Sequence, residues 1–369
     1  MSLLIKMADQ LKNIIEDIAR DFLNSALTLR YDICTCAICK NDMLAHILSH
    51  VPAKYVTTEQ GALHTIMQQT RAEHQAEVAR AILQAIELIG KNPRHKIKED
   101  KNQTFNLLLE KIHEDRNIDF RHYHQDLLRR RVAVRIKTLG LPSYSEYLRL
   151  LINSPEEYDR LFEVLCINVS EFLRDTDVWV QMRKLFEADI RHKKSNHERS
   201  IRVWSAGCAN GEEPYTIAIL LREILGTELS GFSVEIIATD VDKKAMEAAK
   251  KGQYEKNSIK NLEKSIVDKH FCCSGGLYEV NDQIKKMVSI KYLNLTSNDL
   301  VTGCDFVLCR NVFIYFDRSL QEQLLMKYYN GLKPNGYLTM GKSETLIREA
   351  TQIFEPIDVE NRIYRKKAA

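Results

Sequence analysis

Several features that would assign the chain to a common protein class are missing from its sequence. No apolar run approaches the ~20 residues of a membrane-spanning helix, and the first residues show no signal-peptide cleavage pattern. The net charge of +3 is too small to predict binding to a nucleic acid polymer. The nine cysteines are an odd number scattered over a long chain, which fits a reducing compartment better than a disulfide framework. We therefore expect a cytoplasmic protein without membrane insertion.

Phosphate-binding and nucleophile motifs are also missing from the stretch around residues 201–225, which is the centre of the predicted main domain. It contains neither GxGxxG nor GxxxxGK, so it offers no typical backbone cradle for phosphate groups. No Ser-His-Asp or Cys-His constellation is recognisable in it either. The stretch is therefore not a phosphate cradle, and the missing constellation is not evidence against catalysis, because some reactions need little acid-base help.

A strand, a turn and a helix follow one another between residues 201 and 225. The apolar segment 201–206 predicts a buried parallel strand. The segment 214–225 is apolar on one face and predicts a helix, with Pro214 expected at its first position. Gly207 and Gly211 lie between the two elements, where they would let the backbone approach a ligand. This arrangement is typical of one half of a nucleotide-type site.

The acidic residues of this region indicate the kind of ligand. Glu212 and Glu213 would stand at the helix N-terminus and repel phosphate, but they suit a ligand with a cationic amine. Asp240 ends a second predicted strand, residues 233–240, where an acid commonly binds ribose hydroxyls. Its alternative role is to cap the helix predicted over residues 243–251. S-adenosylmethionine has both an amine and a ribose, and we expect it to be the cofactor.

Three segments of the chain together resemble one enzyme family. They are Asn168–Asp175 (NVSEFLRD), Val203–Tyr215 (VWSAGCANGEEPY) and Cys309–Asp317 (CRNVFIYFD), in that order. They are similar to the motifs of the chemotaxis receptor glutamate methyltransferases, the CheR family, and the similarity covers roughly residues 100–369. It implies an α/β class I methyltransferase domain with a doubly wound sheet of about seven strands, one of them antiparallel, preceded by a helical subdomain.

The resemblance also implies which residues bind and orient. Ser170 has a second explanation, because it could simply cap a helix starting at Glu171. Tyr315 follows the third motif and is expected on the acceptor side. The implied cofactor-binding residues are Asn168, Ser170, Arg174, Gly207, Glu212, Glu213, Asp240, Asn294, Leu295, Arg310 and Asn311.

A basic helix is predicted over residues 123–139. One side is apolar, and the other side is rich in arginine. A run of charge is commonly no more than a solvated face, and binding to RNA or DNA is a weaker alternative because no aromatic platform accompanies it. The resemblance favours docking to acidic receptor helices, with Arg131 and Arg135 orienting the substrate. The apolar stripe is Leu128, Val132, Ile136 and Leu139, and the basic residues are Arg129, Arg130, Arg131, Arg135 and Lys137.

The N-terminal unit resembles a second family. A CxCxxC block precedes a predicted helix with Asp42 and Ala45, and His50–Thr57 and Gly61 follow. The pattern is similar to the late-competence ComFB-type domains. This resemblance implies a helical unit that can dimerise, and it brings zinc and cyclic di-GMP into consideration as ligands.

Cys34, Cys36 and Cys39 lie close enough in sequence for three thiolates to reach one zinc ion, which prefers four tetrahedral ligands. A fourth ligand could come from His46, from His50 or from a partner subunit. The alternative is that these cysteines are small buried apolar side chains at the start of a helix. We prefer the structural metal site.

These observations predict a domain order and a function. Residues 1–92 form a regulatory helical domain, 93–101 a linker, 102–195 the helical subdomain and 196–369 the cofactor-binding domain, with a small β-insert near 252–292. We expect a protein-glutamate methyltransferase acting on the cytoplasmic helices of methyl-accepting chemoreceptors. One alternative is a methyltransferase for another acidic protein. The other is a signalling adaptor built on a degenerate methyltransferase fold.

Overall fold

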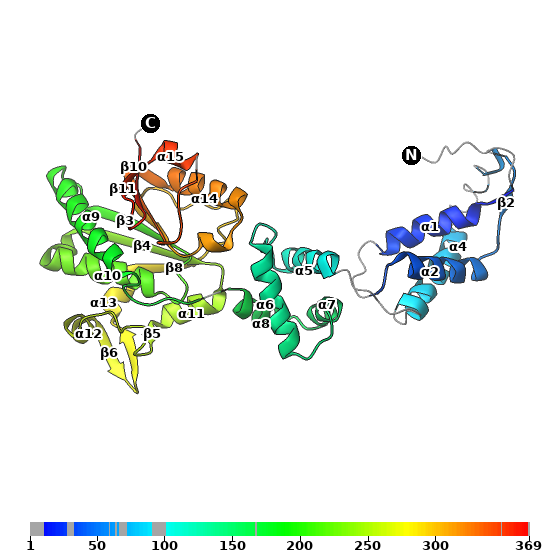
Figure 1. The fold of residues 1–369 in the computed structure, drawn as a ribbon, viewed down its shortest axis with the longest axis horizontal. Coiled ribbons are helices and arrows are strands. Elements are labelled where there is room, and N and C mark those ends of the chain that lie inside the picture. The colour runs from blue at the N-terminus through cyan, green and yellow to red at the C-terminus, as the bar shows by residue number, and fades with distance from the viewer. Residues whose placement is uncertain are drawn as a thin grey trace. The chain divides into compact units, whose positions relative to one another are not determined.

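The structure is a computed structural model that describes residues 11–27, 33–58, 60–62, 65, 72–90, 101–166, 168–347 and 349–367. Figure 1 shows its elements in order. The chain divides into two compact units, one of Met1–Leu108 with Ile136–Glu157 and the other of Leu109–Arg135 with Tyr158–Ala369. No helix among the described residues is both long enough and apolar enough to span a bilayer.

The N-terminal part of the first unit is a small helical domain. Its core is formed by apolar side chains of three elements, α1 (Ile14–Leu27), α2 (Ala37–His50) and α4 (Ala72–Ala85), the last continued by a π-helical turn, η1 (Ile86–Gly90). The apolar residues of the segment 1–30 recur at helical spacing and predict a single helix there. This prediction is wrong at residues 12 and 13, because Lys12–Asn13 form strand β1 and pair with β2 (Tyr55–Val56). Leu4 and Met7 of that prediction lie outside the described residues.

Five further helices separate this domain from the main sheet. The predicted basic helix is α6 (Gln125–Thr138), and its apolar stripe is buried at Leu128, Val132 and Ile136. Leu139 is exposed because the helix has already ended. No helix starts at Glu171, so the capping role considered for Ser170 is wrong, and the next helix begins after Asp175 instead. The helices are α5 (Lys101–Arg116), α6 (Gln125–Thr138), α7 (Tyr144–Asn153), α8 (Glu157–Leu165) and α9 (Thr176–Ser195).

A seven-stranded sheet is the centre of the second unit, in the order β11-β12-β10-β9-β3-β4-β8. Strand β12 is antiparallel to both of its neighbours, and the other pairs are parallel. The predicted sheet with one antiparallel strand is therefore confirmed. The strands are β3 (Ser200–Ala206), β4 (Ser233–Asp240), β8 (Val288–Tyr292), β9 (Cys304–Cys309), β10 (Leu332–Met340), β11 (Phe354–Asp358) and β12 (Ile363–Lys366).

Helices cover both faces of this sheet (Figure 1). Along β3, Ile201 and Val203 pack with α9 and α10 (Glu212–Leu225), whereas Trp204 and Ala206 pack with α14 (Arg318–Gly331) on the opposite face. This alternation follows from the two-residue period of a strand and gives two apolar cores. Helix α10 begins two residues earlier than predicted, so Pro214 occupies its third position rather than its first.

A small β-insert interrupts the alternation of strands and helices after α11 (Lys243–Lys251). Its three-stranded sheet has the order β5-β7-β6, and Gly275 and Gly276 form the turn between β6 and β7 with positive φ angles. The other elements from Gln253 to Lys285 are β5 (Gln253–Tyr254), α12 (Lys264–His270), β6 (Phe271–Ser274), β7 (Leu277–Val280) and α13 (Asp282–Lys285).

Candidate functional site

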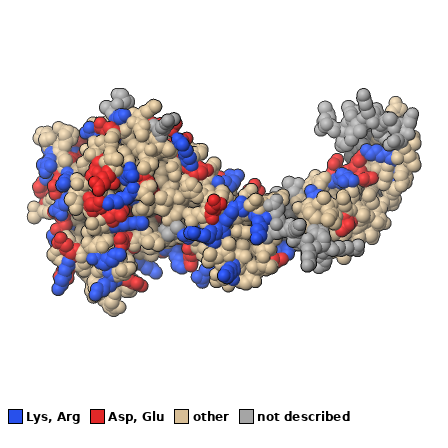
Figure 2. All heavy atoms as spheres, in the orientation of Figure 1, with Lys and Arg blue, Asp and Glu red and all other residues tan. Residues whose placement is uncertain are grey.

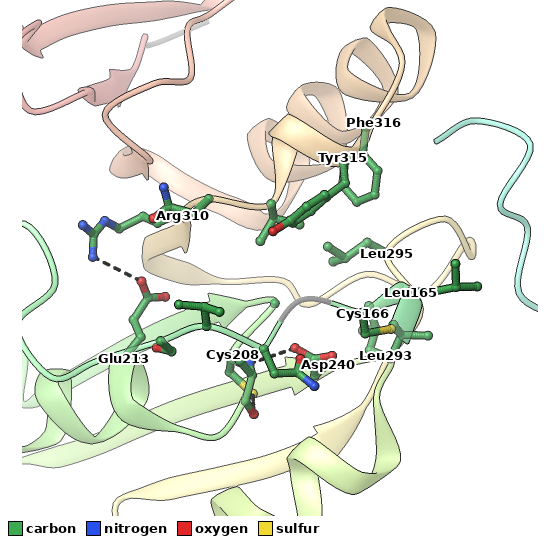
Figure 3. A pocket seen from close by; sticks show the side chains of 18 of the residues that line it. Leu165, Cys166, Cys208, Glu213, Asp240, Leu293, Leu295, Arg310, Tyr315 and Phe316 are labelled. Carbon is green, nitrogen blue, oxygen red and sulfur yellow. Dashed lines mark hydrogen bonds and ion pairs between the residues drawn. The ribbon is translucent and has the colours of Figure 1, made fainter. Parts of the chain in front are cut away.

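A pocket lies at the carboxyl ends of β3, β4, β8 and β9, where ligands commonly bind in doubly wound sheets. All of the predicted cofactor residues except Glu212 contribute to its lining, and Tyr315 does so too. Figure 3 shows Arg310 facing Glu213 at one end of the pocket and Leu165, Cys166 and Leu293 near the other end, with Tyr315 between them. The pocket is therefore polar at one end and more apolar at the other.

The turn after β3 closes tightly around the end of β4. The backbone N–H groups of Gly207 and Cys208 both donate to the carbonyl of Thr239, over 2.8 and 3.0 Å. Gly207 has a φ of +81°, and a Cβ there would stand 2.6 Å from a methyl carbon of Val312. Glycine is thus required at position 207 both by backbone conformation and by the approach of the loop that follows β9.

Asp240 is held at the end of β4 by backbone donors. Its Oδ2 accepts from Ala209 N over 2.8 Å, and its Oδ1 accepts from Asp242 N over 2.9 Å. Burial raises the pKa of the Asp240 carboxyl. The residue that caps α11 is Asp242, which accepts from the N–H groups of Lys244 and Ala245, so the capping role considered for Asp240 is wrong.

Asn168 is connected to the same cap. Its side-chain amide donates to Asp242 Oδ2 over 2.6 Å, and its backbone carbonyl accepts from Asn210 Nδ2 over 3.3 Å. Through these contacts the predicted motif 168–175 lies against the turn after β3 and against the start of α11. Asn294, in the loop after β8, also lines the pocket. Its Oδ1 accepts from the backbone N–H and from the hydroxyl of Thr296.

The polar end of the pocket combines one partly buried carboxylate with two guanidinium groups. Glu213 Oε1 accepts from Ser205 Oγ over 2.8 Å, and its Oε2 lies 3.5 Å from Arg310 Nη1. Burial raises the pKa of Glu213, although the charge of Arg310 opposes this shift. Arg310 also donates to Asp175 over 2.8 Å, and Arg174 donates to the Val169 carbonyl over 2.9 Å. Arg310, which follows β9, therefore holds the 169–175 segment against the sheet, whereas the Arg174 bond closes a contact within that segment.

Glu212 is placed behind the pocket rather than in its lining. The side chain is buried, and burial raises the pKa of its carboxyl to about 7, although its own backbone N–H and the Ser170 side chain oppose the shift. Its Oε2 has no hydrogen-bond partner among the described residues. The structure therefore separates two neighbouring glutamates for which the sequence predicted one role.

An aromatic wall was missed by sequence reasoning. Phe120 and Tyr123, from the connection between α5 and α6, line the pocket together with Phe316. The rings of Tyr123 and Phe316 meet edge to face, 4.9 Å apart, and His124 N donates to the Tyr315 carbonyl over 2.9 Å. Burial raises the pKa of Tyr123 and of Tyr315. Nothing in the sequence points to Phe120 and Tyr123, because they lie before or at the start of the predicted basic helix and far from the three motifs.

The predicted orienting arginines do not line the pocket. Arg131 on α6 donates from Nη1 to the Val164 carbonyl over 2.6 Å, and both Arg131 and Arg135 are half-buried. Arg130 and Lys137 on the same helix are exposed. Figure 2 shows Lys and Arg side chains gathered over the segment that Figure 1 labels α5 and α6.

The three N-terminal cysteines are brought together. The sulfur atoms of Cys34, Cys36 and Cys39 all lie within 4.8 Å of one another. Cys36 caps α2 by accepting from Cys39 N, and burial of its thiol is outweighed by hydrogen bonds from Cys39 and Cys34, which lower its pKa to about 7. In the part of the chain that the structure describes, neither His46 nor His50 joins this cluster. Their imidazole rings lie against each other instead, with centroids 4.2 Å apart.

The chemistry of the pocket fits S-adenosylmethionine. The hydroxyl and amine groups of this cofactor donate hydrogen bonds, and the pocket offers acceptors at Asp240, at Glu213 and at the buried Oδ1 of Asn311, which has no partner among the described residues. A purine favours apolar surroundings, and Leu165, Leu293 and Leu295 give one part of the pocket an apolar lining.

Comparison with known protein families gives three matches along the chain. Residues 168–363 match the CheR methyltransferase, SAM binding domain, and residues 103–166 match the CheR methyltransferase, all-alpha domain. Residues 12–93 match the late competence development protein ComFB. The predicted relationship to both families is therefore confirmed, and the cofactor of the matched domain is S-adenosylmethionine.

Individual relatives agree with these matches. The chain is 33% identical over 226 residues to the chemotaxis protein methyltransferase of Borreliella burgdorferi, a match that covers 60% of this chain and 80% of the relative. It is 30% identical over 248 residues to the chemotaxis protein methyltransferase of Escherichia coli, covering 65% of this chain and 83% of the relative.

Proposed function

Because the chain belongs to the CheR methyltransferase family, we propose that it transfers methyl groups from S-adenosylmethionine to glutamate side chains on the cytoplasmic helices of chemoreceptors. The proposal rests chiefly on one observation, the pocket at the carboxyl ends of the parallel strands, which Asp240 and Glu213 line as partly buried acceptors. Relatives named chemotaxis protein methyltransferase support the choice of acceptor.

Each pocket residue has a proposed binding role. Asp240 accepts from the ribose hydroxyls, Glu213 pairs with the amino group, and Arg174 is the group suited to the ligand's carboxylate. Asn168, Ser170, Gly207, Asn294, Leu295, Arg310 and Asn311 complete the cofactor side, and Glu212 supports it from behind. The cofactor supplies an electrophilic methyl group on a sulfonium, which is its own leaving group.

The acceptor needs orientation more than it needs a base. A glutamate with an ordinary pKa of about 4.3 is already a carboxylate at neutral pH. The protein must then align its oxygen with the methyl group and exclude water from it. The aromatic wall around Tyr315 is suited to the second task, and Tyr315 is proposed as its acceptor-side residue. This explains why the pocket needs no histidine base.

Docking of the acceptor is proposed to use helix α6. Its exposed and half-buried cations, among them Arg131 and Arg135, would attract the acidic helices of a receptor and steer their glutamates. Because Arg131 also donates to the Val164 carbonyl beside Leu165 and Cys166 of the pocket lining, a docked receptor helix would lie close to the cofactor.

A methyl-transfer assay tests this proposal. The intact protein is incubated with radiolabelled S-adenosylmethionine and purified cytoplasmic fragments of chemoreceptors, and base-labile volatile label is counted, because a carboxyl methyl ester releases methanol in alkali. The proposal expects label on the receptor fragment. Label on another acidic protein alone would identify a different acceptor. Binding of S-adenosylhomocysteine without any transfer would favour a signalling adaptor.

For the N-terminal domain we propose a regulatory role. The match to ComFB and the cysteine cluster support a unit that senses a cyclic dinucleotide such as cyclic di-GMP, with zinc held by Cys34, Cys36 and Cys39, and that pairs with a second copy of itself. Calorimetric titration of the intact protein with cyclic di-GMP tests the first point. Binding followed by a changed methylation rate supports it, and the absence of binding contradicts it.

A further inference from the structure

Glu344 is a buried carboxylate outside the predicted site, and it points at the loop that follows β9. It lies three residues after Gly341, beyond the end of β10, and is 4% exposed. Its Oε2 accepts from Gly341 N over 2.6 Å and from Asn311 N over 3.1 Å, and its Oε1 accepts from Phe313 N over 2.8 Å. Two of these three donors belong to the pocket loop.

The contact between the two loops leaves no spare room. A Cβ at position 341 would stand 2.7 Å from Asn311 N and 2.8 Å from Glu344 Oε2. Asn311 itself has a φ of +61°, an uncommon backbone conformation for a residue other than glycine. Such a conformation persists only where the surroundings impose it, and the bond from Asn311 N to Glu344 is one such constraint.

A second side chain binds the backbone carbonyl groups of the same loop. Gln321 on α14 donates from Nε2 to the Phe313 carbonyl over 2.9 Å and to the Phe316 carbonyl over 3.0 Å. These bonds enclose the short 3-10 turn η3 (Phe313–Tyr315). The N–H groups of the loop are thus bound by Glu344 and its carbonyls by Gln321, while Asn311, Val312, Tyr315 and Phe316 line the pocket.

We infer that Glu344 is a positioning residue for the methyl-transfer site, which fixes the 311–316 loop so that Asn311 meets the cofactor and Tyr315 meets the acceptor. Gln321 assists from the opposite side of the loop. The acceptor part of this inference rests on the proposed function. The cofactor part needs only the binding of S-adenosylmethionine or its product.

A carboxylate is needed at position 344 for a reason of hydrogen-bond chemistry. Both of its oxygens accept, and together they receive three N–H donors. A glutamine amide has one oxygen and one NH₂ group, so either orientation turns N–H donors toward backbone N–H donors. The loop must then shift, because an unsatisfied buried donor is costly.

The variant Glu344→Gln tests this inference, with Glu349→Gln as a matched control that alters an exposed glutamate five residues later. We measure the affinity for S-adenosylhomocysteine by calorimetry, and kcat and KM for the receptor fragment, all below the unfolding transition. Glu344→Gln should weaken S-adenosylhomocysteine binding at least tenfold and lower kcat at least tenfold, while the control stays within twofold of wild type. A purely structural Glu344 would lower the melting temperature only, and unchanged affinity and kcat would overturn the inference.

A second variant covers the case in which Glu344→Gln does not fold. Gln321→Leu removes both carbonyl contacts from a partly exposed helix position, and kcat should fall at least fivefold with a smaller change in S-adenosylhomocysteine affinity. Wild-type kcat and affinity in Gln321→Leu would overturn the inference. If the wild type binds S-adenosylhomocysteine but labels no receptor fragment, the proposed acceptor is wrong, and the affinity comparison still decides the role of Glu344.

Discussion

Lys193 on α9 donates from Nζ to Oδ1 of Asp305 on β9 over 2.7 Å, and both side chains are almost completely buried. Asp305 also accepts from Lys333 Nζ over 2.9 Å and from Arg202 N over 2.7 Å. One carboxylate thus connects a helix and three strands of the sheet at the end opposite the pocket. Its negative charge is compensated by two lysines and one backbone N–H.

Breaking this buried pair should destabilise the protein strongly. Lys193→Met leaves Asp305 buried with only Lys333 as a cationic partner, so we expect a loss of about 3 kcal/mol of unfolding free energy. Denaturant unfolding followed by circular dichroism measures it. Lys194→Met is the control, because Lys194 pairs with the half-exposed Glu228 and should cost less than about 1 kcal/mol. Equal losses in the two variants would refute the role of Asp305.

Asp189, near the same lysine, should make stability depend on pH. Burial raises the pKa of its carboxyl to about 6, with the charge of Lys193 opposing the shift, and its Oδ2 is buried without a partner in the described structure. A raised pKa means that ionisation weakens the folded state, so stability is lost as the pH rises through about 6.

Asp189→Asn should therefore stabilise the protein at pH 8 by about 1 kcal/mol, a value reduced for partial exposure, and should have little effect near pH 4. Thermal melts at several pH values measure the difference. Glu187→Gln, on the exposed side of α9, should show no such pH dependence. A benefit of Asp189→Asn that grows toward low pH would contradict this explanation.

Much of the fold was predictable because its signals are local. Buried parallel strands are continuous apolar runs, as in 233–240, and the predicted strand matches β4. The predicted helix over residues 243–251 matches α11, where Asp242 caps the start and Gly252 ends it. At the N-terminus the apolar spacing continued through Lys12–Asn13, but pairing with residues 55–56 outweighed the helical pattern.

The residues of the pocket were predictable only where they belong to a recognisable sequence motif. Asp240 could be placed because an acid is the last residue of an apolar strand, whereas Glu344 lies beyond the end of β10 at Met340 and is not marked in this way. Nothing in the sequence indicates that the carboxylate of Glu344 accepts hydrogen bonds from the backbone N–H groups of Asn311 and Phe313. Likewise, Tyr123 reaches the pocket through pairing with Phe316, a contact between segments about 190 residues apart.

Cofactor affinity should depend on pH through Glu213. Burial raises the pKa of this carboxyl, and only the carboxylate can pair with an ammonium group. Affinity for S-adenosylhomocysteine should therefore fall as the pH is lowered from 8 and the Glu213 carboxyl takes up a proton. Asp240, whose pKa is also raised by burial, should contribute to the effect.

Glu213→Gln should weaken S-adenosylhomocysteine binding by about 10-fold to 100-fold at pH 8 and reduce its pH dependence, since a charged hydrogen bond contributes about 1.5–3 kcal/mol. Calorimetry at pH 8 and at a series of lower pH values measures the loss and its pH dependence. Glu212→Gln is the comparison, and because Glu212 lies behind the lining it should weaken binding less. A larger loss in Glu212→Gln than in Glu213→Gln would show that the pairing is assigned to the wrong glutamate.

The cysteine cluster should bind zinc. Protein purified without chelator should contain close to one zinc per chain if a ligand outside the described residues, or a partner subunit, completes the site. Inductively coupled plasma mass spectrometry measures the metal. Cys36→Ser should lose most of it, and Cys272→Ser, at an exposed cysteine far along the chain, should retain it. Equal metal content in the two variants would leave the three thiols as ordinary side chains.

The most direct test of the central claim is to identify the methylated atom. Receptor fragments treated with the enzyme and S-adenosylmethionine are digested and analysed by mass spectrometry. The account predicts a methyl ester on glutamates of the receptor's cytoplasmic helices, and its loss with Asp240→Asn, which removes the proposed ribose acceptor. Receptor peptides left unmodified by an enzyme that binds S-adenosylhomocysteine, or a methyl group found on nitrogen, would contradict it.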